Sequence, residues 1–118
     1  MIKRVGLRYV DDCPLPSKTN ETISKFYNLT FPIQRFPIND VKQFYFEVTS
    51  KKQNHNLIYR EALTPEGKLV LDFDGFEFNV PSSDLITVTD SLHDIIEQEY
   101  YDKLREPTIN YMRTGRLE

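Results

Sequence analysis

The sequence predicts an α+β fold, in which a four-stranded antiparallel sheet carries a long C-terminal helix packed on one face. Three observations lead to this fold class. Residues 2–10 and 41–80 alternate apolar and polar side chains, which is the period of half-buried strands. Polar turns separate the later strands, and residues 81–106 repeat apolar side chains at the helical period. With one short helix after the first strand, the predicted element order is β-α-β-β-β-α.

Composition predicts one domain covering residues 1–118, because a chain of 118 residues builds a single modest core. Apolar residues make up 39% and aromatic residues 13%, which favours a folded chain. The net charge of −3 disfavours binding to nucleic acid, and no apolar run is long enough to span a membrane. A single cysteine cannot form an internal disulfide, so we expect a cytoplasmic protein.

The first predicted strand, IKRVGLRYV, ends at DDCPLPSK, where two prolines interrupt backbone pairing. One of its faces is apolar and the other basic: Val5, Leu7 and Tyr9 oppose Arg4 and Arg8.

The next segment, TNETISKFYN, predicts a short helix. Thr19 or Asn20 can cap its first turn, and Ile23, Phe26 and Tyr27 share one face. An irregular, proline-containing segment, LTFPIQRFPIND, is then expected to press on the core.

The second predicted strand, VKQFYFEVTS, places Phe44, Phe46 and Val48 on one face and Gln43, Tyr45 and Glu47 on the other. A polar loop, KKQNHN, leads to the third strand, NLIYREALT. The turn TPEGK should close a hairpin, because Pro65 suits its second position and Gly67 tolerates positive φ.

The last predicted strand, KLVLDFDGFEFNV, directs Asp72 and Asp74 away from its apolar face. After Gly75 the apolar residues change parity, which predicts a β-bulge that returns Phe76, Phe78 and Val80 to the core. The five phenylalanines Phe44, Phe46, Phe73, Phe76 and Phe78 are therefore all interpreted as core. Tyr45 and Tyr59 are candidates for the outward face.

The C-terminal helix is expected to begin at PSSD and to end or kink at Pro107. TINYMRTG is a candidate for one more turn. The residues of the C-terminal helix that are expected to face the core are Leu85, Val88, Leu92, Ile95, Ile96, Tyr100 and Leu104.

An apolar strand running into Asp-x-Asp-Gly resembles the motif by which haloacid dehalogenase-like phosphatases present a nucleophilic aspartate. In that family the motif ends the first strand of a parallel fold, whereas here it lies in the final strand. We therefore expect Asp72 and Asp74 to pair with arginines across the strands, namely Arg4, Arg8 or Arg60. The alternative is a metal-dependent phosphoryl-transfer or hydrolytic enzyme that uses Asp72 and Asp74 with His93.

Other candidate chemistry is sparse. His93, Asp94 and Glu97 have the helical spacing of metal ligands, but a bond from His93 to nearby backbone is the favoured interpretation. His55 is interpreted as a solvated loop residue. The carboxylates beside Cys13 should raise the pKa of its thiol, which disfavours a nucleophilic role. No cofactor motif is present in the sequence.

Basic residues gather only at Lys51 with Lys52 and near the C-terminus, at Arg105, Arg113 and Arg116. Single-stranded nucleic-acid binding is therefore the weakest of three functional hypotheses.

The segments IKRVGLRYVDDCPLP, LVLDFDGF and LHDIIEQEYYDKL together resemble a sporadically distributed family of bacterial and archaeal hypothetical proteins. That family has a GLRY-type strand, an aspartate-bearing strand and an LHD-type helix. The resemblance implies that this chain corresponds to the family's C-terminal half, and it implies no activity. Its signature positions would be Gly6, Arg8, Tyr9, Asp72, Asp74, Leu92, His93 and Asp94.

The favoured functional prediction is a non-enzymatic protein-binding or scaffolding domain that acts through its polar sheet face. That face should carry Arg4, Arg8, Tyr45, Glu47, Arg60, Asp72 and Asp74. The expected partner is another protein, a missing N-terminal half or a second copy in a homodimer. No cofactor and no metal are expected.

Overall fold

The computed structural model describes residues 1–109 and contains one four-stranded sheet in the order β1-β4-β3-β2. Each pair of neighbouring strands is antiparallel. The strands are β1 (Ile2–Cys13), β2 (Phe44–Lys52), β3 (His55–Leu63) and β4 (Leu69–Val80). The predicted α+β class, with a four-stranded antiparallel sheet and a C-terminal helix against it, is confirmed.

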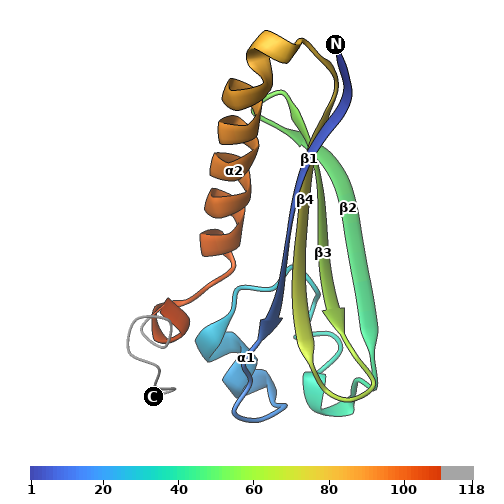
Figure 1. The fold of residues 1–118 in the computed structure, drawn as a ribbon. Helices are drawn as coiled ribbons and strands as arrows, with labels where there is room; N and C mark the ends of the chain where they lie inside the picture. Colours follow the sequence, from blue (N-terminus) through green and yellow to red (C-terminus); the bar gives the residue numbers. More distant parts are fainter. Residues whose placement is uncertain (110–118) are drawn as a thin grey trace.

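The helices lie on one side of the sheet, which we call the inner face (Figure 1). Helix α2 (Leu85–Asp102) follows a 3-10 turn, η2 (Ser82–Asp84), and runs along β4 and β1. Helix α1 (Asn20–Phe26) and a second 3-10 turn, η1 (Ile38–Asp40), cover the other end of the same face. As predicted, Thr19 caps α1, because its side chain accepts a hydrogen bond from the Thr22 backbone N–H.

The core forms between the inner face and these helices. Leu71 and Phe73 of β4 are fully buried and pack in one cluster with Tyr59 of β3 and Ile95 of α2. Burying each such side chain stabilises the fold by roughly 1.5–3 kcal/mol. Tyr59, a candidate for the outward face, instead belongs to this core, because the register places it directly opposite Phe73.

Both hairpins turn through residues with positive φ. Gly67 has a φ of 86°, as predicted for TPEGK. The predicted loop KKQNHN is far shorter than expected, because Lys52 pairs with His55 and only Gln53 and Asn54 form the turn. Their φ values of 51° and 69° are those of a type I′ turn, whose twist suits a two-residue hairpin.

The predicted β-bulge at Gly75 is wrong. β4 pairs without interruption through Gly75 with Leu7 on β1 and with Leu57 on β3. Phe76 and Phe78 therefore point away from the core, and Phe78 is 54% exposed. The side chains of β4 change from one face of the sheet to the other only later, at Asn79.

Asn79 adopts a φ of 55°, after which Val80 packs with Val5 and Leu92 on the inner face. Gly75 has a different role, since it brings α2 close to the sheet backbone. A Cβ added there would already contact the side chains of Ile96 and Leu92 at 3.4 Å.

Helix α2 ends at Asp102, before Pro107. The chain then pairs with the end of α1: Asn28 N–H donates to the Lys103 carbonyl, and Arg105 N–H donates to the Phe26 carbonyl. Residues 106–109 form a further helical turn around the proline. The rest of TINYMRTG, together with Arg113 and Arg116, lies outside the described residues.

Candidate functional site

The face of the sheet opposite the helices, which we call the outer face, receives every second side chain of the four strands. It gathers Arg4, Arg8, Val10, Tyr45, Glu47, Thr49, Asn56, Ile58, Arg60, Asp72, Asp74, Phe76 and Phe78. All six candidate binding residues, Arg4, Arg8, Tyr45, Arg60, Asp72 and Asp74, therefore lie on one surface. Their role in binding stays a prediction.

Asp72 is the best-buried carboxylate of the outer face, with 6% of the residue exposed. Arg8 of β1 forms a bidentate hydrogen bond with it, with Nε 3.1 Å from Oδ1 and Nη2 2.7 Å from Oδ2. Arg60 donates from β3 to the same Oδ2 at 3.2 Å. The hydrogen bond and charge of Asp72 raise the pKa of Arg8 above its ordinary value. The predicted cross-strand pairing of Asp72 is confirmed.

The network continues to the far edge of the sheet. Arg60 Nε donates to Glu47 Oε1 on β2 at 2.6 Å, and the Tyr45 hydroxyl donates to the same oxygen at 3.0 Å. These bonds, from Arg60 first and then Tyr45, lower the pKa of Glu47 below its ordinary value. The resulting chain of contacts, Tyr45–Glu47–Arg60–Asp72–Arg8, crosses all four strands, and we call it the Arg–Asp ladder.

A second, looser group lies beside the ladder. Arg4 Nη2 is 3.6 Å from Asp74 Oδ1, and its guanidinium carbon lies 4.8 Å from the centre of the Phe76 ring. Gly6, opposite Phe76 in the register, makes room for this arrangement. A Cβ on Gly6 would lie 2.6 Å from Arg4 Nη1, so the arginine would have to shift.

Exposed apolar side chains flank these charges. Val10 is 52% exposed, Phe78 54% and Tyr45 65%. Arginine and aromatic residues around a partly apolar surface are the composition that distinguishes protein interfaces from the remaining protein surface.

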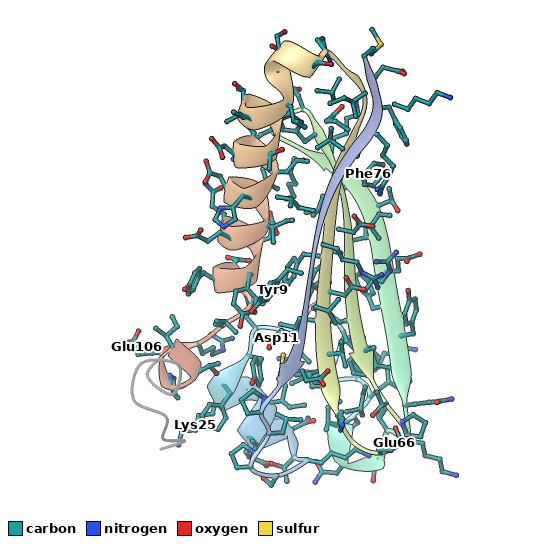
Figure 2. The ribbon with its side chains drawn as sticks, in the orientation of Figure 1. Tyr9, Asp11, Lys25, Glu66, Phe76 and Glu106 are labelled. Atoms are coloured by element: carbon teal, nitrogen blue, oxygen red, sulfur yellow. The ribbon has the colours of Figure 1, made fainter. Side chains whose placement is uncertain are left out.

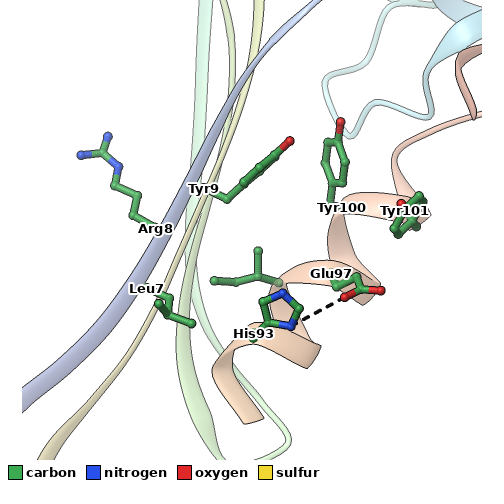
Figure 3. A pocket seen from close by; sticks show the side chains of 8 residues that line it. Leu7, Arg8, Tyr9, His93, Glu97, Tyr100 and Tyr101 are labelled. Carbon is green, nitrogen blue, oxygen red and sulfur yellow. Dashed lines mark ion pairs between the residues drawn. The ribbon is translucent and has the colours of Figure 1, made fainter. Parts of the chain in front are cut away.

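His93 does not join the two aspartates. It lies on α2, on the inner side of the sheet, whereas Asp72 and Asp74 point to the outer face. Its side chain is 67% exposed, and Nδ1 lies 3.6 Å from Glu97 Oε2 (Figure 3). The expected bond from His93 to nearby backbone is thus replaced by carboxylate contacts within the helix. Within residues 1–109, no group of three or more His, Cys, Asp or Glu side chains could hold a metal ion.

Two further predictions concern Cys13 and His55. Burial first, and the charge of Asp11 second, raise the pKa of the Cys13 thiol well above its ordinary range, so the predicted direction is confirmed. His55 is not a solvated loop residue. It begins β3, and its Nδ1 lies 3.1 Å from Glu77 Oε1 on β4.

Glu61 is the buried acid that the sequence pattern gave no reason to single out. It lies on the inner face of β3 with no exposed surface. Its two carboxylate oxygens accept the backbone N–H groups of Thr30 and Phe31 at 2.6 and 2.8 Å, and the Tyr59 hydroxyl donates to it as well. Lys103 Nζ lies 3.8 Å from Glu61 Oε1. Glu61 therefore anchors the irregular segment after α1 to the sheet. Its position among alternating apolar residues of a strand was the available signal.

A hollow of about 390 Å³ lies on the inner side, between α2 and the edge strand β1 (Figure 3). Leu7 and Tyr9 line it from β1, and Ile96, Tyr100 and Tyr101 line it from α2. Figure 2 places Tyr9 and Asp11 on the helix side of the sheet. Tyr9 and Tyr100 meet edge to face with ring centres 5.0 Å apart, and the Tyr100 hydroxyl donates to Asp11.

None of the helices in residues 1–109 has the length and apolar character needed to cross a bilayer. Comparisons with protein-family models, with curated proteins and with solved structures return no match for this chain.

Proposed function

We propose that this chain is a non-enzymatic protein-binding domain, acting in the cytoplasm, whose outer face contacts a second protein. One observation carries the proposal. The described helices and the segment after α1 pack on the inner face, so nothing within residues 1–109 covers the Arg–Asp ladder and its apolar neighbours.

The ladder suits binding because its long side chains are already held in place. Arg8 keeps 60% of its side chain exposed while it is fixed on Asp72, so ordering it on binding costs little further entropy. A fitting partner surface offers hydrogen-bond acceptors to the outward N–H groups of Arg8. It also offers apolar side chains to Val10 and Phe78.

The proposal can be tested by photo-crosslinking in the cells that naturally produce the protein. A photoreactive phenylalanine replaces Phe78 on the outer face, and the same residue replaces Ile86 of α2, which is 75% exposed, as the control. We expect a discrete protein adduct from position 78 only. Adding Asp72→Asn, which weakens the ladder, should reduce that adduct.

Identical adducts from positions 78 and 86 would contradict the proposal, and so would an adduct that Asp72→Asn leaves unchanged. Complete absence of adducts from position 78 would also count against it.

A further inference from the structure

β1 forms an edge of the sheet and pairs, within the described residues, with β4 alone. It runs for 12 residues without a proline, and it pairs with β4 at every residue except Lys3. Every second residue of such a strand directs its backbone N–H and C=O away from the sheet. An unprotected edge of this length is a template for another strand.

The charges of β1 indicate which strand fits. Lys3 and Arg4 lie near its start, Arg8 lies near its middle, and Asp11 and Asp12 lie near its end. An antiparallel copy of the same strand therefore runs with its basic start beside the acidic end of the first. In a pairing centred on Leu7, Lys3 lies opposite Asp11 and Val5 lies opposite Tyr9, each pair occurring twice.

The hollow beside β1 supports the same pairing. In the register centred on Leu7, Val5, Leu7 and Tyr9 of both copies face the inner side, where the hollow lies. The second copy's Val5 and Leu7 would then sit beside Tyr9, which is 42% exposed in the single chain. A β-branched residue opposite an aromatic one is a favourable cross-strand pair.

We propose that a second copy of this chain adds to β1 in antiparallel register centred on Leu7, so that one sheet continues through a two-fold symmetric dimer. The opposite edge strand, β2, is shorter, with 9 residues against the 12 of β1. This dimer uses the edge of the sheet and shares Arg4, Arg8 and Val10 of β1 with the outer face, but it does not depend on the proposed function of that face.

Sedimentation velocity of matched edge variants tests the dimer. Val10 is half-exposed and would lie opposite Arg4 of the second copy, so Val10→Lys places like charges together at two symmetric positions. We expect the dimer Kd to rise about tenfold or more. Val10→Glu should lower the Kd instead, a change of sign that loss of the valine side chain alone would not produce. Lys3→Glu, opposite Asp11, should raise it.

Val48→Lys on β2 is the matched control, since Val48 is 41% exposed on the opposite edge strand and should leave the Kd unchanged. A wild-type chain that sediments as a monomer at high micromolar concentration would overturn the proposal. Equal weakening by Val10→Lys and Val48→Lys, or weakening by both Val10→Lys and Val10→Glu, would overturn it too.

Discussion

Replacing Glu61 by alanine should destabilise the fold more than any other loss of a single carboxylate on the inner face. Its carboxylate is completely buried and accepts the backbone N–H groups of Thr30 and Phe31 together with the Tyr59 hydroxyl. Removing the side chain leaves these donors without their acceptor. The segment after α1 would then lose its attachment to β3.

The magnitude follows from the three bonds. A hydrogen bond to a charged group contributes roughly 1.5–3 kcal/mol. Thr30 is exposed, so water can replace the acceptor there, and the lower value of about 1.5 kcal/mol applies to each of the two backbone bonds. Orphaning the buried Tyr59 hydroxyl adds about 1 kcal/mol. The expected loss is about 4 kcal/mol, a large share of the roughly 5–15 kcal/mol that stabilises a typical domain.

Urea unfolding followed by circular dichroism measures this loss, because the chain has no tryptophan to report by fluorescence. With a slope of about 1.5–2 kcal/mol per molar urea, the midpoint should fall by about 2–3 M. Glu61→Gln keeps one acceptor oxygen and should lose about half as much. The control is Glu77→Ala on β4, whose partly exposed contact with His55 is worth roughly 0–1 kcal/mol.

The reasoning about Glu61 is refuted if Glu61→Ala lowers the midpoint no more than Glu77→Ala does. Hydrogen exchange provides a second check, because the amides of Thr30 and Phe31 should exchange faster in Glu61→Ala than in the wild type. Unchanged protection of both amides would show that the carboxylate does not hold them.

Three further outcomes are expected. Millimolar Mg²⁺, Mn²⁺ or Zn²⁺ should leave the melting temperature unchanged, because arginine N–H groups already bind both carboxylate oxygens of Asp72. A rise in melting temperature with any of these ions would support the hydrolytic-enzyme alternative instead. Stability should fall as the pH rises above about 9.0 to 10.0, the ordinary pKa values of cysteine and tyrosine. Burial raises the pKa of Cys13, Tyr27, Tyr59 and Tyr100 above these values, so the unfolded chain loses those protons first; a titration by circular dichroism checks this. A double-mutant cycle of Arg8→Ala and Asp72→Ala should show non-additive losses of stability, and strict additivity would remove the ladder's energetic basis.

The sheet was predictable because its signals are local. Alternation of side chains fixed the inner positions of β2, and Gly67 marked the turn between β3 and β4. The same alternation also placed Asp72 and Arg60 on one face. Arginines and aspartates on a shared face leave few other partners for a buried carboxylate, so the ladder followed from the pattern.

The end of β4 was not predictable in this way. Both Gly75 and Asn79 can interrupt a strand, and the change of parity after Gly75 pointed to the glycine. The position of α2 distinguishes them. Gly75 stays paired within the sheet, where the side chain of Ile96 packs close to it. Asn79 instead adopts the positive φ after which Val80 faces inward. Phe76 and Phe78 consequently became outer-face residues. Glu61 escaped prediction for a similar reason, since its partners are backbone groups 30 and 31 residues away.

Arg8 connects the two surfaces proposed for this chain. It holds the end of the ladder on Asp72, and it also lies on the edge strand to which the second copy would add. In the register centred on Leu7, the residue opposite Arg8 is Gly6 of the second copy, which has no side chain to displace the guanidinium from Asp72. The two ladders would then face one another across the dimer axis without a clash. A larger residue in place of Gly6 would displace Arg4 in its own chain. In the proposed dimer it would also meet Arg8 of the second copy, so the glycine would serve both surfaces at once.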